Sequence, residues 1–160
     1  MAEANQTEDQ KQLSISKIYI KDFSFESPKA PDVFRSREWQ PQTDLNLRSS
    51  HKPVEGEEGV HEVILTVTVD AKEGDTTLFL VELQQAGLFQ ISGYSEEEFG
   101  AIVGSFCPNI LFPYARETIA NAVSKGGFPE FVLQPINFDA LYMQSRQQAA
   151  QQQAETAEKH

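Results

Sequence analysis

The sequence predicts an α+β domain in which a four-stranded antiparallel sheet carries helices on one side. Apolar and polar residues alternate over much of residues 13–92, and after Gly93 the apolar residues recur with helical spacing. Strands that all precede the helices favour an antiparallel sheet with the helices on one face. The chain has 160 residues, which is the size of a single domain.

Two polar ends flank the expected domain. Residues 1–12 carry no apolar pattern, so we expect a disordered head. Residues 144–160 are rich in Gln and Ala, which are good helix formers, so we expect a helix to continue into the first half of a flexible tail. The expected folded unit is therefore residues 13–143, without an internal repeat.

The first expected strand is Leu13–Glu26, where the alternation is continuous. Strict alternation places Tyr19 and Phe23 on one face, and Ile20 and Asp22 on the other. Neither face is then purely apolar, so we expect both faces to meet something.

A loop rich in proline follows the first strand. Pro28, Pro31 and Pro41 bracket Phe34 and Trp39. Large aromatic side chains in such a loop either fold back onto the core or line a pocket, and the sequence leaves both interpretations open.

Three more strands are expected. Thr43–Arg48 alternates around Leu45, Val60–Ala71 is dense in β-branched residues, and Thr76–Ser92 follows a short turn that contains Gly74. A sheet of four strands leaves one face to be covered, and oligomerisation is the simplest cover. The last, long strand is a candidate for the face along which subunits pair.

Helices are expected after Gly93. Ser95 followed by Glu98 fits a capping box at the start of a helix that runs to about Ser105. We expect Pro108 to interrupt it, and a second helix over Ile110–Lys125 to carry Pro113 in its first turn.

The second helix is expected to stop at Gly126-Gly127. Residues Pro129–Pro135 should be extended. Asn137 can then cap a last helix, because Phe138, Leu141 and Tyr142 follow at helical spacing.

The charge balance limits the classes of partner. The 24 acidic and 13 basic residues give a formal charge of −11, which disfavours nucleic acid and anionic membranes and favours a basic or apolar partner. The sequence starts MAEANQTEDQKQ, which is unlike a signal peptide, and stretches such as Val63–Val69 are too short to span a bilayer. We therefore expect a cytoplasmic protein that does not insert into the membrane.

The residue patterns of common catalytic sites are missing. His51, His61 and His160 are not spaced as metal ligands, and neither a phosphate-binding glycine loop with Lys nor a G-x-S-x-G motif occurs. Cys107, the only cysteine, is either a buried small hydrophobe or the nucleophile of a thiol hydrolase. We favour the former and expect no catalytic residue, metal or cofactor.

Two expected strands carry acidic residues on one face. Asp22 and Glu26 lie about 13 Å apart on the first strand, and Leu80 lies beside Glu82 on the last. The pattern fits either a docking surface for a basic partner or an ordinary solvated face.

Several blocks of this sequence together resemble the SecB family of protein-export chaperones. They are Ile18–Glu26, Pro28, Ala30-Pro31, Phe34, Trp39-Gln40-Pro41, Cys107–Glu117, Phe128-Pro129 and Pro135–Tyr142. The resemblance covers residues 13–144 and thus leaves out only the two ends.

The resemblance implies a dimer of dimers that acts as an ATP-independent holdase in the bacterial cytosol. It implies binding of unfolded precursors of exported proteins and their delivery to the translocation motor ATPase SecA. The implied motor-docking residues are Asp22, Glu26, Leu80 and Glu82. The implied residues of the client groove are Phe34, Trp39, Leu45, Phe138, Leu141 and Tyr142. A general anti-aggregation factor or an adaptor without an export role is the alternative.

Overall fold

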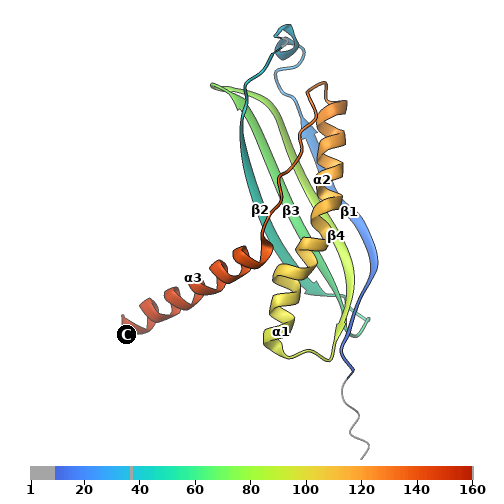
Figure 1. Cartoon of the computed structure of the whole chain (residues 1–160), viewed down its shortest axis with the longest axis vertical. Coiled ribbons are helices and arrows are strands. Elements are labelled where there is room, and N and C mark those ends of the chain that lie inside the picture. Colours follow the sequence, from blue (N-terminus) through green and yellow to red (C-terminus); the bar gives the residue numbers. More distant parts are fainter. Residues whose placement is uncertain (1–9, 37, 160) are drawn as a thin grey trace, which may run out of the picture.

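The computed structural model describes residues 10–36 and 38–159. The sheet has the strand order β1-β4-β3-β2, and all of its neighbouring strands are antiparallel (Figure 1). The strands are β1 (Gln12–Glu26), β2 (Gln42–Pro53), β3 (Val60–Glu73) and β4 (Thr76–Ser92). The helices are α1 (Glu96–Ala101), the π-helical turn η2 (Ile102–Phe106), α2 (Cys107–Lys125) and α3 (Phe138–Glu158), and a 3-10 turn η1 spans Asp32–Arg35. The predicted α+β class with a four-stranded antiparallel sheet is confirmed.

The helices α1 and α2, joined through η2, cover one face of the sheet (Figure 1). The odd-numbered residues of β4 face this layer: Gly87 lies against Leu111 of α2, and Val81, Leu83 and Phe89 are fully buried. In the described part of the chain, the opposite face carries no helix. We call it the open face.

Strand β4 is central in the sheet. It pairs with β1 on one side and with β3 on the other, so both of its edges are already hydrogen-bonded within the chain. The edges of the sheet are therefore β1 and β2, and the pairing of subunits through a face of β4 stays a prediction.

Strand β1 departs from strict alternation at two register shifts, between Ile15 and Lys17 and between Ile20 and Asp22. Each extra residue reverses the face on which the following side chains lie. The apolar residues that pair with the helix-facing positions of β4 are Leu13, Ile15, Ile18, Ile20, Phe23 and Phe25. The expectation of two mixed faces is therefore wrong, because the shifts collect the apolar residues on the helix side.

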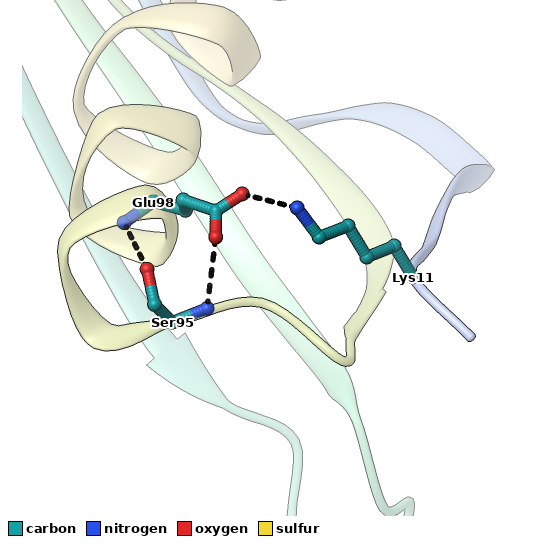
Figure 2. Close-up of polar contacts among 3 residues, drawn as sticks. All are labelled: Lys11, Ser95 and Glu98. Atoms are coloured by element: carbon teal, nitrogen blue, oxygen red, sulfur yellow. Dashed lines mark hydrogen bonds and ion pairs between the residues drawn. The ribbon is translucent and has the colours of Figure 1, made fainter. Parts of the chain in front are cut away.

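The start of α1 carries the predicted capping box. The Ser95 hydroxyl accepts a hydrogen bond from the Glu98 backbone N–H at 3.2 Å, and the Glu98 carboxylate accepts one from the Ser95 N–H at 3.4 Å. Figure 2 shows that the other oxygen of Glu98 binds Lys11 Nζ, at 2.8 Å. These hydrogen bonds, first of all that from Lys11, lower the pKa of Glu98 and tie the approach to β1 to the helical layer.

The expected interruption at Pro108 is wrong, because the helical run continues through it. The Cys107 N–H donates to the carbonyl of Ile102, which makes a wider, π-helical turn just before Pro108. Pro113 lies inside α2 rather than in a first turn. A π turn and an internal proline are the usual causes of helix bending, and the run bends between α1 and α2 (Figure 1).

The last helix is longer than expected. Helix α2 ends as predicted at Gly126, and Gly127 has a φ of +91°. The Asn137 side chain accepts a hydrogen bond from the Ala140 N–H at 3.0 Å and caps α3, which continues to Glu158 and leaves the body of the domain (Figure 1). The expected domain boundary at residue 143 thus falls inside α3, and most of the expected head, residues 1–9, lies outside the described residues.

Candidate docking face and client groove

The four residues of the expected docking surface lie together on the open face. Glu26 pairs with Leu80, Ser24 pairs with Glu82, and Asp22 pairs with Gln84. Side chains of directly paired residues in an antiparallel sheet project to the same face. The three carboxylates are exposed and Leu80 is half-buried between them.

Two further carboxylates extend this surface across the sheet. Leu80 pairs with Asp70 of β3, which in turn pairs with Asp44 of β2. One row of side chains, Glu26–Leu80–Asp70–Asp44, therefore crosses all four strands. We call this row, together with Asp22 and Glu82, the acidic face. Sequence reasoning missed Asp44 and Asp70, because only the strand order brings them beside Leu80.

The other end of the open face centres on a buried carboxylate. Glu62 of β3 is 7% exposed; it accepts hydrogen bonds from the Tyr19 hydroxyl and from Lys21 Nζ at 2.7 Å, and Lys52 Nζ lies at 3.7 Å. Burial alone raises the pKa of Glu62, but the hydrogen bonds from Lys21 and Tyr19 outweigh it and hold the pKa below its ordinary value. Burial and the bond to Glu62 raise the pKa of Tyr19 to about 12. This cluster ties β1 and β2 to β3 across the sheet.

Glu62→Gln is expected to lower the free energy of unfolding at pH 7 by about 2–3 kcal/mol, because Lys21 loses its partner in a partly buried site. The folded-state pKa of Glu62 lies below the ordinary value of 4.5. The contribution is therefore complete above the unfolded-state pKa and is lost as the pH falls through the folded-state pKa. Urea denaturation at pH 7 and at about pH 3.5 measures this, and the difference from the wild type should shrink at the lower pH.

Glu58→Gln, in the exposed turn between β2 and β3, is the control and should change stability by less than about 0.5 kcal/mol. Equal stability of Glu62→Gln and wild type at pH 7 would contradict the role given to this cluster.

Phe34 and Trp39 belong to one aromatic cluster next to the end of α2. The ring centroid of Phe128 lies 5.4 Å from that of Phe34 and 5.3 Å from that of Trp39, and Trp39 Nε1 donates to the Val33 carbonyl at 3.1 Å. Trp39 thus packs against the core and also lines a pocket, so both of the interpretations that the sequence left open apply.

This aromatic pocket has a volume of about 200 Å³. Its walls are Trp39, Pro41, Thr43, Leu78, Phe79, Phe128, Pro129, Glu130 and Phe131. Phe34 is not part of the pocket wall; it packs on Phe128, which is, and is itself 41% exposed. Sequence reasoning missed Phe79, Phe128 and Phe131, although the Phe128-Pro129 pair directly after a helix stop is a visible signal.

A larger pocket of about 630 Å³ lies between β2 and the start of α3, and we call it the helix pocket. Phe138, Leu141 and Tyr142 line it together with residues of β2 such as Leu47. Of the three α3 residues, Leu141 is the most exposed, at 45%, whereas Phe138 is buried.

Helix α3 is held against the helical layer by close packing. A Cβ atom on Gly104 would lie 2.5 Å from the Tyr142 ring, and one on Gly100 would lie 2.8 Å from its hydroxyl, so the ring needs both glycines. The Ser105 hydroxyl donates to Asp139. Tyr142 therefore anchors α3 as well as lining the helix pocket.

Leu45 lines neither pocket but lies between them. Along the helix-facing side of β2, Thr43 lines the aromatic pocket and Leu47 lines the helix pocket. Leu45 occupies the intervening position on that side and is 41% exposed. Of the six expected groove residues, Trp39 thus lines the aromatic pocket and Phe138, Leu141 and Tyr142 line the helix pocket. Leu45 lies between the two pockets, and Phe34 packs on Phe128 outside both.

The one cysteine is unsuited to catalysis. Cys107 is fully buried, and burial raises the pKa of its thiol to about 12. Among the described residues, no three His, Cys, Asp or Glu side chains are grouped so that they could hold a metal ion. Over the same residues, no helix combines the length and the apolar character needed to cross a membrane.

Comparison with known proteins decides the family. The family model described as "Preprotein translocase subunit SecB" matches residues 6–149. The chain is 52% identical to the protein-export protein SecB of Methylococcus capsulatus over the full length of both chains. It is 55% identical to that of Nitrosococcus oceani, over 87% of this chain and 84% of the relative. The chain belongs to the SecB family. It is therefore a protein-export chaperone, and the alternative of an enzyme built on Cys107 is wrong.

The fold is also that of a solved SecB-like structure. The Mycobacterium tuberculosis Rv1957 SecB-like chaperone, in complex with a ChAD peptide from the Rv1956 HigA1 antitoxin, matches with a TM-score of 0.63. The match covers 78% of this chain and 90% of that one, at 16% identity. At this identity the comparison shows that the SecB fold is shared.

Proposed function

We propose that this chain is an ATP-independent holdase that binds unfolded precursors of exported proteins in the bacterial cytosol and delivers them to the motor ATPase SecA. One observation carries the proposal: the two apolar pockets lie on the helix side of the sheet, whereas the acidic face lies on the open side. A client and a motor can therefore be bound at the same time without competing for one surface.

The two pockets suit extended apolar segments of an unfolded chain. Each large apolar side chain buried in a pocket contributes about 1.5–3 kcal/mol, without a requirement for a particular sequence. Two such sites on one client reinforce each other through effective concentration. The formal charge of −11 keeps a protein with apolar pockets soluble and favours basic client segments.

The acidic face suits a basic surface of the motor. Asp22, Glu26 and Glu82 surround Leu80, so an apolar contact is available inside a ring of charge. Asp44 lies directly opposite Asp70 on the neighbouring strand, and like charges in that position are destabilising. Lys72 Nζ, 3.6 Å from the Asp70 carboxylate, offsets part of this repulsion within the chain, and a cationic partner offsets more of it.

Exposed apolar side chains along one side of the subunit support assembly into a dimer of dimers. They are Ile15, Ile20, Phe23, Phe106 and Tyr114, and each is 38–50% exposed. The first three belong to β1, which is an edge strand, and the other two to η2 and α2. A patch of this kind next to an unpaired strand edge is typical of a protein interface.

The holdase function and the assembly are tested by light scattering. The solution mass is measured for the chain by itself, and again after an unfolded secretory precursor is added without nucleotide. One subunit has a mass of 17.9 kDa, so a tetramer gives about 72 kDa. We expect this mass to rise by that of one client and the mixture to stay soluble. The proposal would be contradicted if the chain were monomeric and the precursor aggregated in its presence.

A further inference from the structure

Residues 129–137 lie in the connection between α2 and α3; they line the aromatic pocket at one end and lead directly into the helix pocket at the other, and we call them the linking segment. At one end Pro129, Glu130 and Phe131 line the aromatic pocket, and Phe138, directly after the other end, lines the helix pocket. Figure 1 shows the segment running from the end of α2 down to α3. Strand β2 supplies one wall of each pocket through Thr43 and Leu47, and the conformation of the linking segment sets how far apart the opposite walls, at Phe131 and Phe138, lie.

The linking segment has little secondary structure of its own to hold that conformation. Over the described residues, the backbone of residues 129–136 takes part in one hydrogen bond, in which Arg116 Nε donates to the Leu133 carbonyl at 2.9 Å. The side chain of Leu133 is also buried. Backbone that lies outside helices and strands keeps its conformational freedom unless such contacts restrict it. The middle of the segment is therefore fixed at Leu133.

Arg116 is itself held in place. Its guanidinium lies 4.9 Å from the centroid of the Phe112 ring, one turn earlier on α2. Phe112 in turn packs edge-on against Phe138, with the centroids 5.5 Å apart. Arg116 thus contacts the middle of the linking segment directly and the start of α3 through Phe112.

We propose that Arg116 is a positioning residue that keeps the aromatic pocket and the helix pocket at a fixed spacing, so that one extended client occupies both. This inference rests on the proposed client-binding function. Arg116 holds backbone, and other side chains form the pocket walls. Loss of Arg116 is therefore expected to weaken the binding of clients that need both pockets. The binding of clients that fill only one pocket should change little.

Two fluorescent peptides test this, one with a single aromatic anchor and one with two anchors about nine residues apart. Nine extended residues span at most about 30 Å, which matches the length of chain in the linking segment. We expect the peptide with two anchors to dissociate about tenfold faster from Arg116→Met than from the wild type, and the other peptide to change less than twofold. Arg116→Lys, which keeps a cation and a donor, should recover part of the loss.

Lys125→Met is the matched control, because it removes one exposed cation from the same helix. We expect it to leave both dissociation rates unchanged. The inference would be overturned if neither peptide dissociated faster from Arg116→Met, or if both dissociated faster by the same factor.

A second measurement needs no client. Trp39 is the one Trp of the sequence and serves as the donor for energy transfer. Because Cys107 is buried, a thiol-reactive dye attaches selectively to the cysteine introduced by Met143→Cys and serves as the acceptor. Met143 is 54% exposed. With equal labelling, time-resolved energy transfer should show a broader distribution of the distance between Trp39 and the dye when Arg116→Met is added than when Arg116 is kept. An unchanged distribution would overturn the inference. If the wild type bound neither peptide, the proposed client function would fail, while energy transfer would still decide the role of Arg116.

Discussion

Glu82→Lys is expected to weaken binding of SecA by at least 100-fold while client capture is kept. Glu82 lies between Ser24 and Thr68 on the open face, one row from Glu26, Leu80 and Asp70. A lysine there removes one favourable charge and repels a basic partner, and each 1.4 kcal/mol lost is tenfold in affinity. Asp22→Ala and Glu82→Ala, which only remove a charge, should each cost about tenfold. Titration calorimetry at low and physiological salt measures these changes, and the salt dependence should decrease with each charge removed.

Glu117→Lys makes the same charge change on an exposed position of α2, away from the open face, and is the matched control. It should leave SecA affinity within about twofold. If Glu82→Lys bound SecA as well as this control does, the docking assignment would be wrong. A wild-type chain that protects clients but does not bind SecA would instead favour a general anti-aggregation factor.

The strands and helix ends could be predicted because their signals are local. The β-branched alternation of β3 and the run of β4 are contained in a few consecutive residues. The capping box of Ser95 and Glu98 and the cap at Asn137 each depend on residues three positions apart. Local patterns of this kind specify an element wherever it is placed in the fold.

The rest depends on contacts between distant residues. The two register shifts in β1 are defined only against β4, and the pattern of alternation in the sequence conceals them. The strand order brings Asp44 and Asp70 beside Leu80, although they belong to three different strands. The aromatic pocket combines residues from the loop before β2, from β4 and from the linking segment, so a single stretch of sequence does not reveal it.

The same distinction between local patterns and distant contacts applies to the surface residues taken from the family resemblance. The docking set alternates on two strands that pair directly, so its members share one face as expected. Among the groove residues, Phe138 is largely buried and Leu45 lies outside both pockets. Side-chain packing decides which residue of an apolar pattern is left exposed, and that packing is set by neighbours such as Gly104 and Phe112.

Trp39→Ala is expected to lower client affinity by about 30-fold, which corresponds to about 2 kcal/mol. Trp39 forms one wall of the aromatic pocket and packs on Phe128, and a buried aromatic side chain is typical of a residue that dominates binding. Fluorescence anisotropy with an unfolded client gives the affinity. Protection of an aggregating client gives the functional consequence.

The same substitution also removes packing from the fold, so the test needs a variant that separates the two effects. Trp39→Phe keeps an aromatic wall but loses the Nε1 donor to the Val33 carbonyl. It should keep client affinity within about threefold, even if its melting temperature falls. If Trp39→Ala is folded and still protects the client fully, the assignment of the aromatic pocket to the client groove would be wrong. Because this pocket and the acidic face lie on opposite sides of the sheet, Trp39→Ala should leave SecA affinity unchanged, as Glu82→Lys should leave client affinity unchanged.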